Sequence, residues 1–322
     1  MAHPERLELA ALPTPLLPLA RLGATLGFAP EMLWVKRDDL TALAGGGNKA
    51  RKLEYLVADA VAKGADTLVT AGAAQSNHVR TTAAAACQAG LRCVAVLGGR
   101  VGDTPEGNLL LDELLGLEPV WVAGYDAHSV ERMLADTTHR LLTEGARPYE
   151  IPLGGASAVG SRGYVHAARE LMSEMPSDAV VYAATGTGGT QAGLAVGFGS
   201  NDRIRGFDVG AIPDVRQRIE KLIPAIAQLE GLSLPGGEVH LDATQIGEAY
   251  GTFTEPGREA LRLAAATEGL ILDPVYSGKA MAGLIADRRA DRLPANMPVV
   301  FLHTGGFPSV FTQRVASWIS AG

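Results

Sequence analysis

Short apolar runs alternate with longer stretches of helical period along most of this chain. The runs DTLVTA (66–71) and AVVYAA (179–184) are typical of buried strands. Residues 49–63 instead repeat leucine, valine and alanine at spacings of three and four, which indicates a helix closed by Gly64. Strands separated by helices form parallel sheets covered on both faces. We therefore expect an α/β fold of this kind.

The same alternation predicts the other elements. We expect strands over residues 66–71, 92–97, 119–122, 149–152, 179–184 and 298–302. We expect helices over residues 49–63, 76–89, 105–115, 157–175, 256–268, 278–290 and 309–318, with others reaching to about 142 and 229, and a less regular segment over 231–255. Ligands of such sheets bind at the carboxyl ends of the strands. Chemistry is therefore expected in the loops 44–49, 72–78, 185–190, 273–279 and 303–308.

Composition excludes several classes of function. The 322 residues carry a net charge of −7 without a long basic cluster, so we expect no nucleic-acid partner. No apolar run is long enough to cross a bilayer, and no secretory signal follows Met1, so we expect a cytoplasmic protein without a membrane partner. The seven histidines lack metal-binding spacing, and we expect no metal site. Cys87 and Cys93 are expected to be reduced and buried.

Lys49 follows the glycine-rich run 45–47 and opens the predicted helix. The positive end of the helix dipole disfavours an ammonium at this position and so lowers the lysine's pKa. A neutral amine is what a Schiff-base lysine requires. The simpler interpretation, a surface lysine on a capped helix, stays open from this motif alone.

A second glycine-rich loop joins the strand AVVYAA to a helix at residues 185–190 (TGTGGT). Backbone N–H groups at a helix N-terminus form an anion site. The loop lacks both the third glycine of a dinucleotide fingerprint and the Gly-Lys-Ser/Thr ending of a Walker A loop. It is therefore expected to bind the phosphate of a small ligand, unless it is only a flexible turn.

Two further loops combine polar side chains with a helix start. Ser76, in the run Gln75-Ser76-Asn77-His78, is a natural N-cap, and this helix N-terminus would suit an amino-acid carboxylate. Tyr276 offers a phenol for proton transfer or stacking, or is simply a packed aromatic. Ser277 can cap the following helix or hydrogen-bond a ring nitrogen.

Six runs appear together in the order and spacing of one enzyme family. They are KRDDLT (36–41), GGGNKARKLEYL (45–56), AGAAQSNHVR (71–80), TGTGGTQAGLAVG (185–197), LDPVYSGKAMAGLI (272–285) and FLHTGG (301–306). The chain thus resembles the D-cysteine desulfhydrase and 1-aminocyclopropane-1-carboxylate deaminase family. This resemblance implies a pyridoxal 5′-phosphate enzyme with the tryptophan-synthase-β-like fold of two open twisted, mainly parallel sheets.

The resemblance also implies domains and residue roles. A small domain would span residues 52–157, and a large cofactor-binding domain would comprise 1–51 and 158–322. The cofactor-binding residues would be Lys49, Lys52, Asn77, Gly186, Thr187, Gly188, Gly189, Thr190 and Ser277. Lys49 would be bonded to the cofactor, and Lys52 and the 186–190 loop would bind its phosphate. Asn77 would face the 3′-oxygen of its pyridine ring. Substrate-binding residues would be Gln75, Ser76, Asn77, Tyr250, Tyr276 and Thr304. Lys49, Ser76 and Tyr276 would be catalytic.

Two positions distinguish members of the family. The deaminases carry Glu and Leu where this chain has Ser277 and Thr304, whereas desulfhydrases carry small hydroxyl residues at both. A hydroxyl leaves the pyridine nitrogen less protonated than a carboxylate does. That weaker electron sink suits the loss of a thiolate better than the opening of a cyclopropane. Phe307, where desulfhydrases are expected to have Ala, and a shortened segment after Gly99 are departures, and the ring of Phe307 is expected to reshape the pocket.

The resemblance predicts α,β-elimination on a small amino acid, with D-cysteine giving pyruvate, hydrogen sulfide and ammonia. Lys49 would take the α-proton, and Tyr276 or a water would protonate the leaving group. L-cysteate sulfo-lyase, β-chloro-D-alanine lyase and, less favoured, 1-aminocyclopropane-1-carboxylate deaminase remain alternatives, as does a non-catalytic amino-acid-binding protein. A homodimer is also implied by the resemblance.

Overall fold

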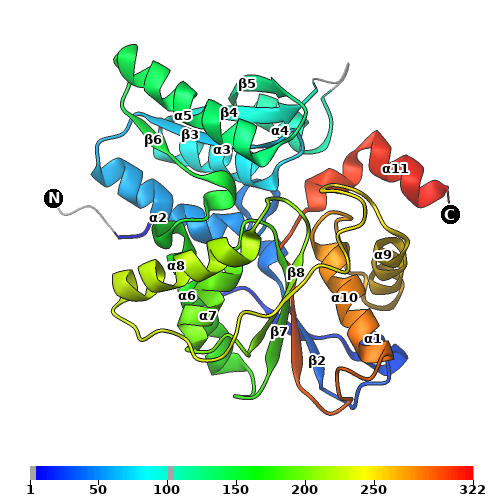
Figure 1. Ribbon diagram of the computed structural model, residues 1–322. Coiled ribbons are helices and arrows are strands. Elements are labelled where there is room, and N and C mark those ends of the chain that lie inside the picture. Colours follow the sequence, from blue (N-terminus) through cyan, green and yellow to red (C-terminus); the bar gives the residue numbers. More distant parts are fainter. Residues whose placement is uncertain (1–4, 101–104, 322) are drawn as a thin grey trace.

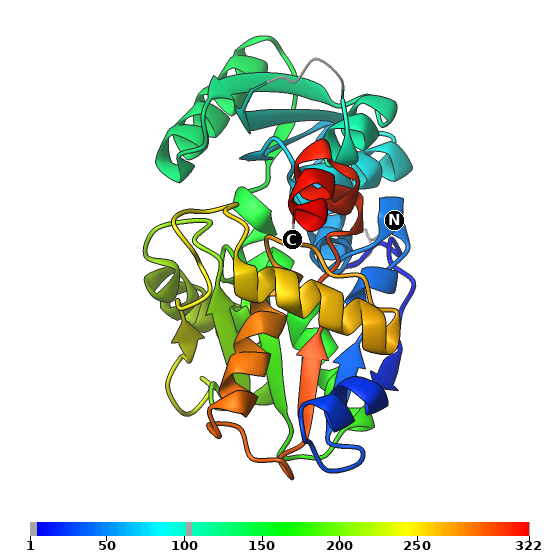
Figure 2. The same ribbon diagram turned by 90° about the vertical axis from the view of Figure 1, so that its right-hand side faces the viewer.

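The computed structural model of the protein describes residues 5–100 and 105–321 and contains two sheets, one above the other in Figures 1 and 2. Two of the expectations fall on residues outside this range. The segment expected to be shortened includes residues 101–104, and the lack of a secretory signal concerns residues that include 1–4. The expected α/β architecture with two mainly parallel sheets is confirmed.

The larger sheet has six strands in the order β1-β2-β10-β7-β8-β9, and every neighbouring pair is parallel except β1 with β2. Its strands are β1 (Leu16–Pro18), β2 (Leu33–Lys36), β7 (Val180–Thr185), β8 (Ile204–Asp208), β9 (Leu241–Asp242) and β10 (Val299–Leu302). The smaller sheet is fully parallel in the order β5-β4-β3-β6, with strands β3 (Thr67–Ala73), β4 (Arg92–Gly99), β5 (Glu118–Ala123) and β6 (Pro148–Glu150).

Helices cover both faces of each sheet (Figure 1). The α-helices are α1 (Ala20–Thr25), α2 (Lys49–Ala62), α3 (Asn77–Ala89), α4 (Gly107–Leu114), α5 (Ala127–Thr143), α6 (Ala158–Glu174), α7 (Gly189–Phe198), α8 (Val215–Glu230), α9 (Glu255–Glu268), α10 (Ser277–Arg289) and α11 (Gln313–Ser320). Short 3-10 helices are η1 (Asp38–Leu40), η2 (Leu43–Gly45), η3 (Leu153–Gly155) and η4 (Phe307–Phe311).

Alternate residues of the central strands enter different cores, which explains why these strands are apolar throughout. On β3, Val69 packs in the core that contains α5 residues, whereas Leu68 packs in the core that contains α2 and α3 residues. On β7, Val181 joins the α6 and α7 side and Tyr182 the α9 and α10 side. Strands buried on both faces lose the polar alternation of a half-exposed sheet.

Most predicted elements are present, with local differences. The helix predicted from Pro105 begins at Gly107, and the predicted last helix is divided into η4 and α11, because the hydroxyl of Thr312 accepts a hydrogen bond from Val315 N at 3.4 Å and caps a new helix. The N-terminal elements β1, α1 and β2 were not anticipated. Both cysteines are free, but only Cys93 is buried; the expectation for Cys87 was wrong, because it lies on the solvent side of α3.

The smaller sheet and helices α3 to α5 all lie within residues 52–157. This supports the small domain with those bounds, which stays a proposal. Among the described residues, none of the helices has both the length and the apolar character needed to cross a membrane.

Candidate active site

A solvent-connected cavity of about 750 Å³ lies where the carboxyl ends of β3, β7 and β10 come together between the two sheets. The loops predicted to carry chemistry line it, through residues 48–52, 71–78, 184–191, 273–276 and 304–305. Segments that lie more than 200 residues apart in the sequence thus meet in one place.

Lys49 is the first residue of α2 and lines the cavity. The loop before it is held on several sides: Asn48 N donates to Thr304 O at 3.0 Å, and Arg80 Nη2 donates to Gly46 O at 2.7 Å. A Cβ at Gly46 would overlap the carbonyl oxygen of Asp39, and its φ of +72° also favours glycine. The close approach of the loop therefore depends on this glycine.

Burial, followed by the positive charge of Arg80, lowers the pKa of Lys49 to about 8. The direction agrees with the prediction, and burial is its largest cause. A lysine with such a pKa carries an appreciable fraction of neutral amine near neutral pH. That is the form that attacks a carbonyl group or accepts a proton.

The opposite side of α2 is fixed by a buried ion cluster. Arg51 donates to both carboxylate oxygens of Asp38, at 2.9 and 2.8 Å, and to Glu170 at 2.9 Å. Burial alone would raise the pKa of Asp38, but Arg51 and the hydroxyls of Tyr164 and Thr14 hold it below its usual value. Bidentate contacts of this type fix orientation as well as position. The cluster therefore fixes the position of α2, and with it that of Lys49, relative to the rest of the cavity.

Lys52 lies one turn after Lys49 and is almost fully buried. Its Nζ donates to Gly154 O at 3.1 Å, and a Cβ at Gly189 would come within 3.0 Å of the same Nζ. Burial, followed by the charge of Lys49, holds the pKa of Lys52 well below its usual value. The Nζ of Lys52 thus lies beside the 186–190 loop, with which the resemblance groups it.

The 186–190 loop connects β7 to α7, with Gly188 at φ +82°. Thr190 Oγ1 accepts from Asn48 Nδ2 at 3.1 Å. The hydroxyl of Ser161 is buried without a hydrogen-bond partner, and a Cβ at Gly189 would lie 3.1 Å from it. Backbone N–H groups, a lysine and an unpartnered hydroxyl therefore surround a position that only glycine leaves open. This donor set fits a phosphate group.

The residues before α3 divide into two groups. Ser76 caps the helix by accepting from Val79 N at 3.3 Å, and Ser76 and Asn77 both line the cavity. Gln75 does not line it. Its side chain instead donates to Glu106 O at 2.9 Å and accepts from Asn108 N at 2.8 Å. Gln75 thus ties α4 to this loop, a role different from the predicted contact with substrate.

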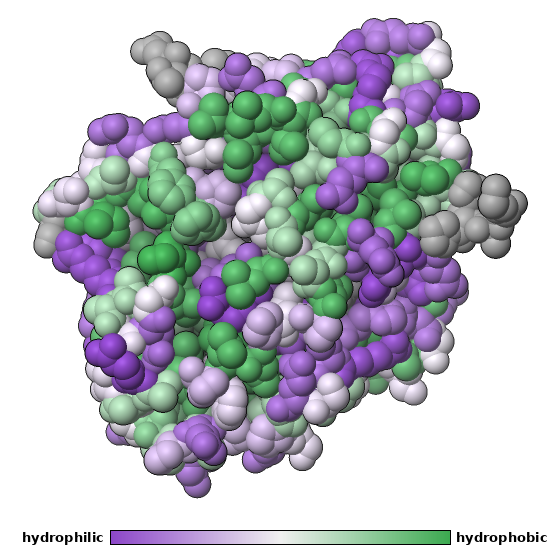
Figure 3. Space-filling model, turned by 180° about the vertical axis from the view of Figure 1, so that it is seen from behind, coloured by the Kyte–Doolittle hydropathy of each residue, from purple (hydrophilic) through white to green (hydrophobic). Residues whose placement is uncertain are grey.

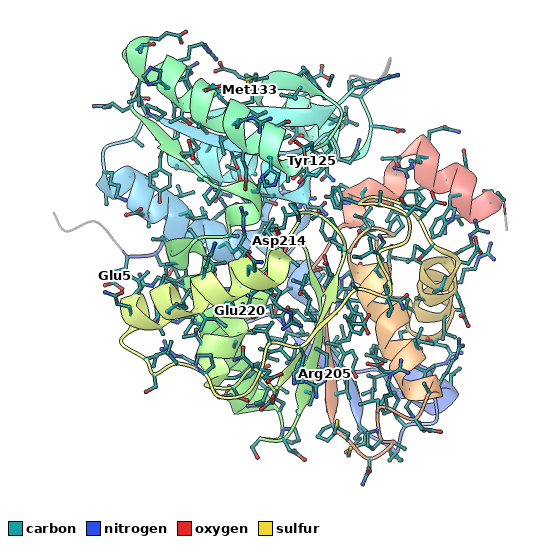
Figure 4. The ribbon with its side chains drawn as sticks, viewed as in Figure 1. Glu5, Tyr125, Met133, Arg205, Asp214 and Glu220 are labelled. Atoms are coloured by element: carbon teal, nitrogen blue, oxygen red, sulfur yellow. The ribbon has the colours of Figure 1, made fainter. Side chains whose placement is uncertain are left out.

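Three tyrosines stand together at the cavity. The hydroxyls of Tyr250 and Tyr276 are hydrogen-bonded to each other, and the ring of Tyr125 lies 5.1 Å from that of Tyr250. Burial holds the pKa of Tyr276 well above its usual value and raises that of Tyr250 to about 12. Both phenols are therefore protonated at neutral pH and can donate. Figure 4 shows Tyr125 at the lower edge of the small sheet, above the loop that carries Asp214.

Thr304 lines the cavity, but Ser277 does not. Ser277 Oγ is buried and donates to Asp273 Oδ1 at 2.6 Å, while Asp273 N donates to Ser277 Oγ at 2.8 Å. Phe307 also stays outside the cavity. Its side chain is 46% exposed and packs edge-on against Phe311, so the expectation that it reshapes the pocket is not supported.

Sequence reasoning missed three residues with titratable side chains that line the cavity: Tyr125, His78 and Asp273. Tyr125 lies in a short loop without a motif. His78 and Asp273 belong to the runs QSNH and DPVYS, where a buried polar residue beside a helix start was a usable signal. The carboxylate of Asp273 accepts from the backbone N–H groups of Tyr276 and Ser277, each at 2.8 Å, and so positions the tyrosine. No cluster of three metal-binding side chains occurs within residues 5–100 and 105–321.

Comparison with known proteins agrees with this geometry. Residues 7–305 match the family described as Pyridoxal-phosphate dependent enzyme. D-cysteine desulfhydrases of Salmonella choleraesuis (strain SC-B67) and Salmonella schwarzengrund (strain CVM19633) are 43% identical, over 96% of this chain and 96% of theirs. The crystal structure of an ACC deaminase homologue is 35% identical with a TM-score of 0.90, covering 98% of this chain and 96% of that one. A pyridoxal 5′-phosphate-dependent aspartate racemase, 18% identical with a TM-score of 0.65 over 91% and 90% of the two chains, shares the fold. The chain therefore belongs to the pyridoxal-phosphate-dependent enzyme family, with pyridoxal 5′-phosphate as its cofactor.

Proposed function

We propose that this enzyme catalyses α,β-elimination on a small β-substituted amino acid, with D-cysteine as its substrate and pyruvate, hydrogen sulfide and ammonia as its products. The observation that carries the proposal is the amine of Lys49, with a pKa of about 8, placed between a phosphate-type loop and the capped start of α3. The choice of D-cysteine rests on the relatives at 43% identity that bear the name D-cysteine desulfhydrase.

The proposed cofactor contacts follow the donor set of the cavity. Lys49 carries the cofactor, Lys52 and the 186–190 loop hold its phosphate, and Asn77 faces its 3′-oxygen. When bound, pyridoxal 5′-phosphate supplies an electron-accepting ring that stabilises negative charge at the substrate's Cα. Because the Ser277 hydroxyl is engaged with Asp273, we assign Ser277 to positioning that carboxylate rather than to direct contact with the ring.

The chain's own residues supply binding and proton transfer. The N-terminus of α3, with Ser76 as its cap, binds the substrate carboxylate, because its free N–H groups favour an anion. The amine of Lys49 removes the α-proton from the face that this contact presents. Tyr276, held as a phenol, donates a proton to the departing sulfur, and its hydrogen bond with the Tyr250 hydroxyl positions it. The released enamine hydrolyses to pyruvate and ammonia.

The test is a panel of substrates supplied to the purified holoenzyme, with keto-acid release as the measurement. The panel contains both enantiomers of cysteine, L-cysteate, β-chloro-D-alanine and 1-aminocyclopropane-1-carboxylate. D-cysteine is expected to give the highest kcat/KM. If L-cysteate or β-chloro-D-alanine is preferred, the proposed reaction type still holds, but the proposed substrate is wrong. Binding of amino acids without turnover by the yellow protein would support a non-catalytic binding protein instead.

We also propose that the protein is cytoplasmic and that it forms a homodimer, as the family resemblance implies.

The surface bears on the homodimer. Apolar side chains gather in several places on the rear face of the molecule (Figure 3). Among the exposed large apolar residues are Leu110 and Leu114 on α4 and Phe307 and Phe311 on η4, and these two helices contact each other. Light scattering coupled to size exclusion tests the assembly, and cell fractionation tests the compartment. A particle with the 33.5 kDa mass of one chain would contradict the dimer.

A further inference from the structure

His78 is a buried residue of the cavity to which the reaction described above assigns no role. Its side chain is 3% exposed, lies on the first turn of α3 and lines the cavity together with Lys49 and Lys52. Its Nδ1 is buried and has no hydrogen-bond partner among the described residues. Buried polar atoms are nearly always paired, so an unpaired one on a residue that lines a ligand cavity points to the ligand.

The hydrogen bonds around His78 determine which ring nitrogen carries the proton. Thr70 Oγ1 has a single proton, which it donates to Ile151 O at 3.0 Å. The 2.9 Å contact between Thr70 Oγ1 and His78 Nε2 therefore requires Nε2–H as the donor. In the neutral ring this leaves Nδ1 as an unprotonated acceptor. The atom without a partner is thus a base.

The surroundings of the imidazole are positively charged. The pKa of His78 is held well below its usual value, mainly by burial and then by the positive charges of Lys49 and Lys52 on α2. The other packed elements present uncharged groups: Thr70 from β3, and Gly155 from η3, where a Cβ would meet His78 Cε1 at 3.4 Å and Lys52 Cδ at 3.6 Å. His78 and Lys52 therefore both lie against Gly155, and Lys52 Nζ in turn lies beside Gly189 of the 186–190 loop.

Three basic groups close together in a buried cavity resist protonation until a counter-charge arrives. A phosphate dianion supplies two negative charges, which favour the protonated forms of its neighbours. We propose that His78 is, after Lys52, a second basic member of the cofactor-phosphate site and that its Nδ1 takes up a proton from solvent when a phosphate dianion binds. One N–H bond forms, and no other bond changes. The inference rests on the cofactor and not on the identity of the substrate.

The test uses the apoenzyme and inorganic phosphate, which lacks an aldehyde and so leaves Lys49 unmodified. Calorimetric titration in two phosphate-free buffers of different ionisation enthalpy counts the protons taken up per phosphate bound. The variant His78→Gln keeps a donor toward Thr70 but removes the base. It is expected to bind phosphate about tenfold more weakly, the scale of one charge-assisted hydrogen bond, and to take up fewer protons. The deficit in affinity should grow as the pH falls from about 8 to about 6.5.

Controls separate this role from a general effect on the fold. Pyridoxal, which has no phosphate, should bind wild type and His78→Gln equally. The variant His139→Gln, at an exposed histidine on α5, should behave as wild type. Wild-type proton uptake and phosphate affinity in His78→Gln would overturn the proposal, because Lys52 would then account for the uptake. If His78→Gln fails to fold, His78→Asn is measured with the same expectation. The absence of proton uptake by the wild-type protein on phosphate binding also overturns the proposal.

Discussion

The hydroxyl of Tyr125 donates a hydrogen bond to the carbonyl oxygen of Ala211 at 3.1 Å. Tyr125 follows β5 of the smaller sheet, whereas Ala211 follows β8 of the larger one, so this bond joins the two sides of the cavity. A second link lies nearby, where Arg218 of α8 contacts Glu131 of α5 at 2.6 Å. Access to the cavity on this side therefore depends on contacts between the proposed domains.

Tyr125→Phe should loosen this side of the cavity while keeping the aromatic contact with Tyr250. The lost bond is expected to cost about 0.5–1.5 kcal/mol, so KM for D-cysteine should rise several-fold with little change in kcat. Steady-state kinetics measure both values. Glu131→Gln breaks the nearby ion pair at its half-buried acidic partner; it is the matched control and should have a smaller effect. A large fall in kcat with unchanged KM would instead place Tyr125 in the chemical step.

Much of the fold follows from the sequence, because the central strands are buried on both faces and the helices between them have clear caps. The runs at 66–71 and 179–184 became β3 and β7, and Gly64 and Gly90 end helices as expected. The N-terminal strand β2 is only four residues long and is followed directly by charged residues. Its identity as a strand depends on pairing with β10, which lies more than 260 residues away.

The site was predictable where chemistry coincides with a strand end, since such ends converge in a parallel sheet. Lys49, Lys52 and the 186–190 loop meet as expected. Side-chain direction was less predictable. Gln75 turns to Asn108, and Ser277 turns to Asp273, because each satisfies a buried backbone or carboxylate group that the local sequence does not reveal. Tyr125 comes from a segment that reaches the cavity only through the packing of the two sheets.

Lys49→Ala should abolish turnover of D-cysteine and leave the purified protein colourless. The substitution removes the amine assigned to carry the cofactor and to remove the α-proton, and residual activity is expected to fall by more than about 10³-fold. Pyruvate release and the visible absorbance of the cofactor are the measurements. Lys63→Ala, at an exposed lysine just after the same helix, is the control. Substantial activity in K49A would exclude the assigned role.

Capture of the cofactor by the apoenzyme should become faster with rising pH and level off above about pH 8. Only the neutral amine attacks the aldehyde, and the pKa of Lys49 is lowered to about 8 by burial and by Arg80. Removing the positive charge in Arg80→Gln raises that pKa, so the profile should move to higher pH. Stopped-flow absorbance gives the profiles. Arg80→Lys, which keeps the charge, should move it less; equal shifts in both variants would assign the effect to lost packing.

Gly189→Ala should weaken binding of pyridoxal 5′-phosphate by at least about tenfold. A Cβ at this position would lie 3.0 Å from both Lys52 Nζ and Ala156 Cα, and it would occupy space beside the phosphate-type loop. Gly236→Ala is the matched control, because a Cβ there meets no atom within 4 Å. Equilibrium titration of both apoenzymes gives the two dissociation constants. Similar dissociation constants for the two variants would contradict the assignment of the cofactor phosphate to this loop.

Ser277→Glu combined with Thr304→Leu should lower kcat/KM for D-cysteine by at least about tenfold. Ser277 Oγ donates to Asp273 at 2.6 Å, so the glutamate would bring a second carboxylate beside the first, and one of the two would have to hold a proton. Thr304→Leu at the same time removes a hydroxyl from the cavity wall. The pair Ser277→Thr and Thr304→Ser keeps both hydroxyls and is the control. Keto-acid release from D-cysteine and from 1-aminocyclopropane-1-carboxylate is measured for each protein. Unchanged desulfhydrase kinetics in the first double variant would mean that these two positions do not set specificity, and that it is set elsewhere, with the tyrosines of the cavity as the next positions to vary.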